Sequence, residues 1–320
     1  MSTVYGRTSV QGVAAWMVSG LGVIVIAAVL RDLFHTLFHP GGQGALSRRV
    51  LVFMWRSARR VGGPRRLGEL AGPLGLVGVI GVWGLLVVVG GALVYWPHIS
   101  EDFSYGAGLD PDGRSDVLDA VYVSLVTTST LGFGDVVPTA GWLRVVTPLQ
   151  ALIGFALLTV AVSWVLQVYP ALSRRRLLAS RLTSLQRAAM HEAIRQADSS
   201  LPAAVLEDLA RQVAGVSVDL SQYAETHYFR DRETRFALAA CLPYAEDLAA
   251  IGRVSSRADL RLAATDLVHA LADLAESLRP HVSTTERTPT AVFRAYAEDH
   301  GETDVLRSPS AAAPSDGDLR

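Results

Sequence analysis

Nine consecutive residues, 127–135, combine the side chains and the backbone freedom needed to bind a dehydrated cation. They read Thr-Thr-Ser-Thr-Leu-Gly-Phe-Gly-Asp, a run of hydroxyls followed by two glycines one residue apart and an acid. Glycines at alternate positions allow φ values that other L-residues avoid. Such a backbone can turn successive carbonyl oxygens toward one axis, where they replace the water shell of an ion. We therefore predict an ion-binding loop, with the Thr130 hydroxyl adding an oxygen at its inner end.

Apolar segments on either side must position this loop. Residues 116–126 have the length and composition of a short helix, and residues 74–96 and 145–169 are long enough to cross a membrane. Non-helical backbone at membrane depth must have its polar groups satisfied by protein, water or ions. The short helix would also direct the partial negative charge of its C-terminus toward a cation. The order of segments therefore favours a loop that lines an ion pathway.

The motif at residues 130–135 resembles the selectivity filter of the potassium channel family, usually written Thr-Val-Gly-Tyr-Gly-Asp. The resemblance covers residues 74–169 and implies an outer helix, a pore helix, a filter and an inner helix. It implies that Asp135 shapes the outer mouth and that five residues coordinate K⁺: Thr130, Leu131, Gly132, Phe133 and Gly134. Leu131 and Phe133 depart from the family pattern but offer the ion only their carbonyls. Because Phe133 lacks the hydroxyl that normally ties the filter to the pore helix, a weakly selective cation channel is an alternative.

Further positions resemble the family inside this module. Gly154 lies 22 residues beyond Gly132, where the family often has a hinge glycine. It is a candidate gating hinge, although a close helix contact would explain the same glycine. Val126 stands where some members have a glutamate, which removes one hydrogen-bond partner for Asp135. The chain holds one filter and no internal repeat, and such a pore needs four filter strands, so we expect a homotetramer.

Charge and hydropathy divide the chain into a membrane half and a cytosolic half. Residues 13–30 are apolar over about 27 Å of helix, which predicts an extra N-terminal span rather than a cleaved signal peptide. Residues 31–73 carry eight arginines and two acids, whereas residues 97–144 carry seven acids and two arginines. Because positive loops lie on the cytoplasmic side, we expect a multi-pass plasma-membrane protein with its N-terminus outside and its C-terminus inside. The acidic loop would raise the local cation concentration at the outer mouth, although a solvated turn would explain the same acids equally well.

Residues 45–61 alternate arginine with large apolar side chains. This pattern favours a helix in the membrane interface, although a solvated basic loop would also explain it. Five arginines are candidates for contact with anionic lipids: Arg48, Arg49, Arg56, Arg59 and Arg60. His35 and His39 share helical spacing but have no third ligand nearby, so we predict no metal site beyond the permeating K⁺.

The predicted architecture is an all-α membrane protein. It consists of an N-terminal transmembrane helix (1–30), a basic cytoplasmic or interfacial segment (31–73), an ion-channel pore module (74–169), a helical cytosolic domain (170–300) and a disordered tail (301–320). We expect the third span to end at Pro170 and the arginines at 174–176, and Pro243 to interrupt a helical pattern over 233–251. The cytosolic domain shows no nucleotide-binding glycine motif, which leaves an assembly role or a ligand sensor open.

These observations predict passive K⁺ permeation through a tetrameric pore. A membrane-anchored sensor or scaffold that acts through its cytosolic domain is an alternative of a different class. No span carries the repeated arginines of a voltage sensor. We find no nucleophile–base set or metal cluster in the sequence, so we expect neither an enzyme nor a cofactor, and no nucleic-acid partner.

Overall fold

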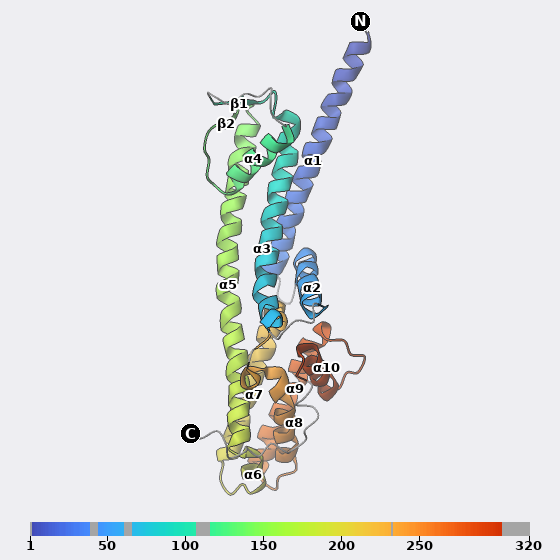
Figure 1. Ribbon diagram of the computed structural model, residues 1–320. Helices are drawn as coiled ribbons and strands as arrows, with labels where there is room; N and C mark the ends of the chain where they lie inside the picture. The colour runs from blue at the N-terminus through green and yellow to red at the C-terminus, as the bar shows by residue number, and fades with distance from the viewer. Residues whose placement is uncertain (1, 39–43, 61–65, 107–115, 232, 303–320) are drawn as a thin grey trace. The chain divides into compact units, whose positions relative to one another are not determined.

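The computed structural model describes residues 2–38, 44–60, 66–106, 116–231 and 233–302. Within these residues three helices are long and apolar enough to cross a membrane: α1 (Ser2–Phe38), α3 (Arg66–Tyr95) and α5 (Leu143–Arg187) (Figure 1). Together with the helical C-terminal part, they confirm the predicted all-α membrane fold with an extra N-terminal span. His39, part of the acidic loop (107–115) and most of the predicted tail (303–320) lie outside the described residues.

Helix α5 is longer than the predicted inner helix (145–169). It continues without interruption through Pro170 to Arg187. A proline inside a helix costs about 3 kcal/mol relative to alanine. Beyond Pro170, α5 buries Leu178, Leu182 and Leu185 in a hydrophobic core. Each buried leucine contributes about 1.5–3 kcal/mol, so packing outweighs the local preference to end the helix.

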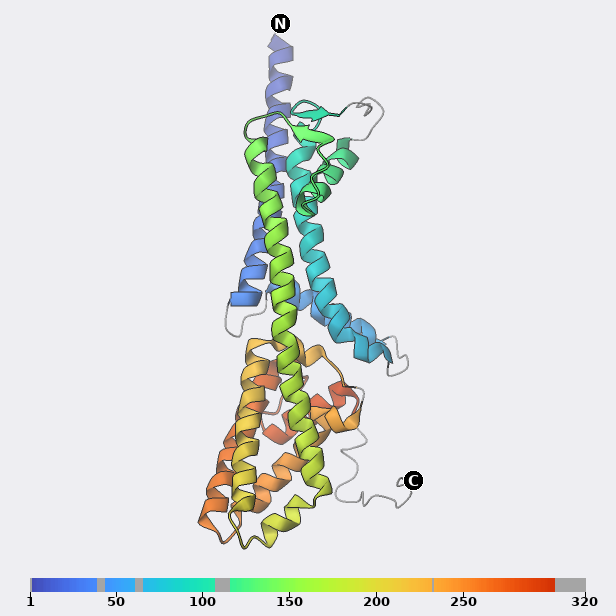
Figure 2. The same cartoon turned by 90° about the vertical axis from the view of Figure 1, so that its left-hand side faces the viewer.

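The chain forms two compact units, of which the first contains residues 1–53 and 75–166. Its helix α4 (Asp116–Thr128) lies beside α3 and α5, and the predicted filter follows it (Figure 2). Two short strands, β1 (Phe103–Tyr105) and β2 (Val136–Pro138), pair antiparallel with Ser104 opposite Val137. The strand pairing, which the sequence did not suggest, returns the chain from the filter to the end of α3.

Helix α1 packs on α3 through small and polar residues. At the Gly22–Gly90 crossing, a methyl group added to either glycine would overlap the backbone oxygen of the other. The Ser19 hydroxyl donates to the Val94 carbonyl at 3.1 Å. Small residues allow this approach in lipid, where dispersion and hydrogen bonds replace the hydrophobic effect between helices.

Helix α2 (Ala45–Arg60) begins at a buried carboxylate on α1. Asp32 accepts hydrogen bonds from the Leu46 amide at 2.8 Å, the Ser47 hydroxyl at 2.6 Å and the Trp83 indole N–H at 3.0 Å. These donors satisfy an acid that would otherwise be costly to bury, and they cap the first turn of α2. Asp32 thereby joins α1, α2 and α3 within the first unit.

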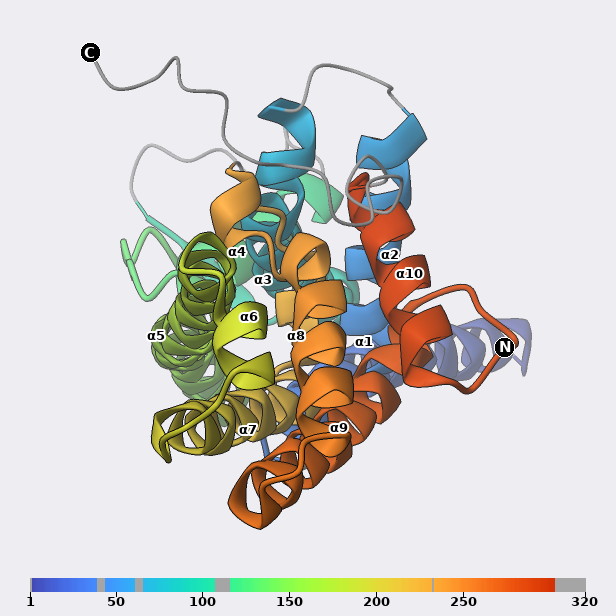
Figure 3. The same ribbon diagram turned by 90° about the horizontal axis from the view of Figure 1, so that it is seen from below.

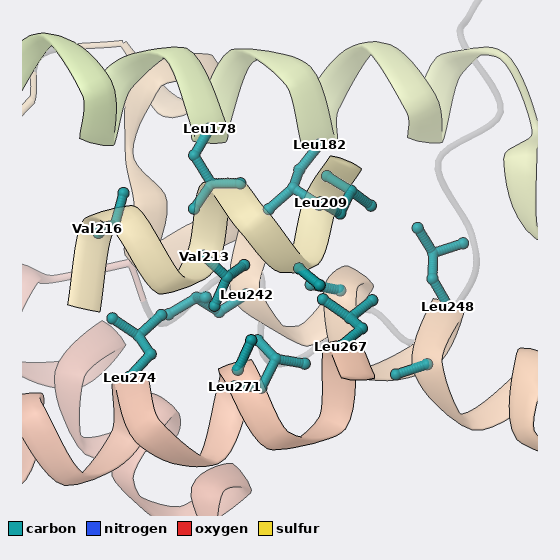
Figure 4. Close-up of a cluster of buried hydrophobic side chains, with 14 of the residues drawn as sticks. Leu178, Leu182, Leu209, Val213, Val216, Leu242, Leu248, Leu267, Leu271 and Leu274 are labelled. Atoms are coloured by element: carbon teal, nitrogen blue, oxygen red, sulfur yellow. The ribbon is translucent and has the colours of Figure 1, made fainter. Parts of the chain in front are cut away.

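The second unit consists of residues 54–74 and 167–320, and it includes the C-terminal part that is predicted to be helical (170–300). It contains α6 (Met190–Arg195), α7 (Leu201–Gln222), α8 (Leu238–Arg253), α9 (Ala258–Leu278) and α10 (Pro289–His300), with 3₁₀ turns at 224–228, 234–236 and 279–281. Helix α9 packs against both α7 and α8 (Figure 3). Leucines and valines at helical spacing form the hydrophobic core of this second unit (Figure 4). Pro243 lies inside α8, so the predicted interruption there is wrong.

The arginines that follow the predicted end of the third span make ion pairs within this second unit. Arg174 donates from Nε and Nη2 to the two carboxylate oxygens of Asp219, at 2.7 and 2.6 Å. Arg175 is buried and pairs with Asp231 at 3.0 Å, and it also donates to the Thr226 carbonyl at 2.6 Å. A buried guanidinium needs such partners, because an unpaired charge in the interior is strongly destabilising.

Candidate ion-conduction site

The backbone of the predicted filter alternates in the sign of φ. Thr130, Gly132 and Gly134 have φ values of +57°, +56° and +75°, whereas the intervening Leu131 and Phe133 are not among the residues of positive φ. In an ordinary strand successive carbonyls point to opposite sides. When alternate residues adopt left-handed values, the peptide planes rotate and successive carbonyls face the same side. The segment therefore has the backbone form that a row of carbonyl ligands requires.

Conformation, rather than lack of space, explains the two glycines. A methyl group added to Gly132 or Gly134 would meet no atom within 4 Å in this chain. Positive φ is strained for most L-residues, and for β-branched ones it is a genuine outlier. Thr130 is β-branched and still has positive φ, so its surroundings must stabilise that conformation.

Helix α4 runs directly into this segment. The Leu131 amide donates to the Val126 carbonyl at 3.1 Å, and the Thr130 amide donates to the Thr127 carbonyl at 3.0 Å. The side chains of Leu131 and Phe133 are 62% and 64% exposed in the single chain. Hydrogen bonds thus fix the first residues of the predicted filter to α4. The side chains of Leu131 and Phe133, in contrast, are largely exposed within one chain.

The carboxylate of Asp135 is held from behind the filter. Tyr122 on α4 donates its hydroxyl to Asp135 Oδ2 at 2.5 Å, and the Val136 amide donates to Oδ1 at 3.1 Å. The Gly106 amide donates to the Asp135 carbonyl at 2.7 Å, next to the β1–β2 pair. Tyr122 therefore supplies a hydrogen bond to an acid whose glutamate partner is replaced by Val126. No sequence motif pairs Tyr122 with Asp135, which lie 13 residues apart in the chain.

Gly154, the candidate hinge, lies in the interior of the continuous helix α5. A methyl group added there would overlap the carbonyl oxygen of Thr128, the last residue of α4. This geometry gives a second reason for glycine at the position, namely the close approach of α5 to α4. The hinge itself stays a prediction.

A polar cluster that sequence reasoning missed lies between α3, α4 and α5. Gln150 on α5 donates to the Ser124 hydroxyl at 2.7 Å and to the Thr128 hydroxyl at 2.8 Å, and it accepts a hydrogen bond from the Tyr95 hydroxyl. Gln150 is 3% exposed, and Ser124 and Tyr95 are fully buried. A glutamine in an apolar span was the one sequence signal that pointed to it. We call these four residues the Gln150 cluster.

Of the predicted lipid-contacting arginines, Arg48, Arg49 and Arg56 are exposed on α2. The side chains of Arg59 and Arg60 lie outside the described residues. Phe53, between Arg49 and Arg56, is 68% exposed, whereas Leu51 and Trp55 are buried. One face of α2 thus combines a large apolar side chain with positive charge. Among the residues that the structure describes, no group of three or more His, Cys, Asp or Glu side chains could hold a metal ion.

Comparison with known proteins agrees with this geometry. Residues 82–169 match a protein family described as "Ion channel". The chain is also 27% identical over 173 residues to the uncharacterized membrane protein YdjJ of Bacillus subtilis (strain 168). That alignment covers 53% of this chain and 49% of the relative, so the chain spans about half the length of the curated relative that it matches. No solved structure matches the chain.

The family match covers α4, the predicted filter and the parts of α3 and α5 on either side of them. Together with the candidate membrane-spanning helices, the match supports similarity of this part of the chain to ion-channel domains. The chain therefore combines a region similar to ion channels with one additional candidate membrane span before it and a helical part after it.

Proposed function

We propose that the protein is a homotetrameric, potassium-selective channel of the plasma membrane, through which K⁺ passes down its electrochemical gradient. The observation that carries the proposal is the alternation of φ over residues 130–134. It supports a row of carbonyl oxygens on one side of the backbone, joined at its inner end by the Thr130 hydroxyl. Rings of such oxygens can replace the hydration shell of K⁺.

The tetramer is supported by what one chain leaves exposed. A single filter strand supplies only one side of each ion site. Helix α4 also exposes apolar side chains on one face, and α5 does so along its length: Val117, Leu118, Val121 and Leu125 on α4, and Leu149, Leu152, Phe155 and Leu158 on α5. Four copies around an axis would cover part of this surface and close the rings.

We further propose that the arginine-rich face of α2 contacts anionic lipid head groups on the cytoplasmic side. Its support is the exposed Phe53 between Arg49 and Arg56, a pattern typical of helices that lie in the interface. The proposal predicts that the full chain melts at a higher temperature in phosphatidylglycerol nanodiscs than in phosphatidylcholine nanodiscs. It also predicts that Arg49→Gln/Arg56→Gln removes the difference, and an unchanged difference in that variant would refute it.

The channel proposal is tested by the reversal potential of the purified protein in a planar bilayer with K⁺ on one side and Na⁺ on the other. The test variant is Gly132→Val, because a β-branched residue is poorly tolerated at positive φ. Gly141→Val is its matched control, since Gly141 also has open space around it but does not have positive φ.

We expect a reversal potential far from zero, with the sign of a K⁺-selective pore, in the wild type and in Gly141→Val, and no selective current in Gly132→Val. A wild-type potential near zero would instead indicate a weakly selective cation channel. A protein that is monomeric or dimeric in detergent and carries no current would favour the membrane-anchored scaffold.

A further inference from the structure

We infer that Gln150 is a positioning residue for the filter, acting through the last residue of α4. The inference rests on the proposed channel function and adds to it the residue that holds the inner end of the filter. Nothing in the filter motif identifies Gln150, which lies on the inner helix 20 residues beyond Thr130 in the sequence.

The hydrogen bonds of the Gln150 cluster use every polar group of the amide. Tyr95 donates to its oxygen, and its nitrogen donates to the hydroxyls of Ser124 and Thr128. The Ser124 hydroxyl then donates to the Val88 carbonyl on α3 at 2.7 Å. The donors therefore run in one direction, from Tyr95 through Gln150 and Ser124 to Val88. This arrangement fixes the orientation of the amide.

Burial makes this arrangement restrictive. Gln150, Ser124 and Tyr95 lie in the apolar interior of the first unit. An amide there that loses its partners carries an uncompensated desolvation cost, so alternative rotamers are disfavoured. Gly91 on α3 leaves the room that the cluster needs, because a methyl group at that position would overlap both Gln150 Nε2 and the Ser124 hydroxyl. The side chain of Gln150 thus connects α3, α4 and α5.

The cluster reaches the filter through Thr128. Thr128 ends α4, and Thr130, two residues later, is the β-branched residue with positive φ. Helix α5 contacts Thr128 at two points one turn apart: Gln150 bonds its side chain, and Gly154 packs against its carbonyl oxygen. Because Phe133 cannot tie the middle of the filter to α4 by a hydroxyl, the position of Thr130 depends on how firmly Thr128 is held.

A purely structural role would make Gln150 a contact that holds helices together without affecting ion discrimination. The two roles differ in the quantity that they change. Loss of a helix contact lowers the stability of the tetramer, whereas loss of filter positioning changes the ratio of K⁺ to Na⁺ permeability in tetramers that still assemble.

The experiment replaces Gln150 with methionine, which has a similar length and cannot form the cluster's hydrogen bonds. Gln167→Met is the matched control, because Gln167 is exposed on the same helix. Thr128→Val and Tyr95→Phe each remove one hydrogen bond and keep the shape of the side chain. Each variant is assayed for tetramer in detergent and for reversal potential with K⁺ opposite Na⁺.

We expect Gln150→Met to lower the permeability ratio about tenfold, which moves the reversal potential by about 59 mV. Thr128→Val should shift the potential in the same direction, Tyr95→Phe should shift it less, and Gln167→Met should match the wild type. A wild-type protein without selectivity would overturn the channel proposal itself. A selective wild type with equally selective Gln150→Met and Thr128→Val variants would overturn this inference alone. If Gln150→Met does not assemble, Thr128→Val and Tyr95→Phe decide the question.

Discussion

The hydrogen bond from Tyr122 to Asp135 allows a quantitative prediction about the outer end of the filter. Tyr122→Phe removes the hydroxyl that lies 2.5 Å from Asp135 Oδ2 and leaves the ring in place. A hydrogen bond to a charged group contributes about 1.5–3 kcal/mol. Because about 1.4 kcal/mol corresponds to a tenfold change in an equilibrium constant, the balance between a held and a released filter should shift about ten- to 150-fold.

The assay for Tyr122→Phe is single-channel recording in planar bilayers with K⁺ on both sides. We expect the ratio of conducting to non-conducting time to fall by the factor given above. Tyr105→Phe is the matched control, because Tyr105 donates its hydroxyl to a different carboxylate, that of Asp119, at 3.0 Å. The reasoning is refuted if Tyr122→Phe conducts like the wild type, or if both variants lose conduction to the same extent.

Two further predictions concern α5 and α10. Gly154→Ala should lower the melting temperature of the full chain, because overpacking against Thr128 costs about 1–3 kcal/mol of stability. Gly84→Ala should leave the melting temperature unchanged, since its methyl group would lie an ordinary 3.8 Å from Leu157. Normal stability with altered opening of the proposed channel would instead favour a hinge at Gly154. Burial lowers the pKa of His300 to about 3, with His227 and Arg175 adding to the effect. The unfolded chain then takes up the proton first, so stability is lost as the pH falls below about 6.5, by about 1.4 kcal/mol per pH unit. His300→Gln should therefore flatten the decline in melting temperature of the full chain between pH 7 and pH 5, and an equally steep decline would contradict the assignment.

The sequence predicts the parts of this fold that depend on local properties. Apolar runs of sufficient length identify the three spans, and the demand for positive φ identifies Gly132 and Gly134. Helix α4 ends within two residues of the prediction, because its composition and its position before the glycines are local signals.

The contacts that hold the site could not be predicted, because they join residues far apart in sequence. Tyr95 lies 55 residues from Gln150, and Trp83 lies 51 residues from Asp32. Neither pair has a periodicity or motif that marks it. Tertiary packing also overrode two local signals, the prolines at 170 and 243, since the helices around them bury leucines in a shared core. Polar pairs that are distant in sequence, and helices that continue through a proline because their leucines pack in a core, are thus the two features that the sequence alone did not predict.

The contacts of Thr128 and Asp135 suggest how the predicted filter could be held despite its departures from the usual motif. Phe133 and Val126 remove polar groups from the middle of the filter and from the helix behind it. The structure has hydrogen bonds at both ends instead, through Thr128 at the inner end and Asp135 at the outer end. Between these two points the side chains of Leu131 and Phe133 are exposed in one chain, so in the proposed tetramer neighbouring subunits would restrain them. If the channel is selective, apolar packing between subunits must then supply the stiffness that a hydroxyl supplies elsewhere. Selectivity should accordingly be more sensitive to the volume of residue 133 than to its polarity.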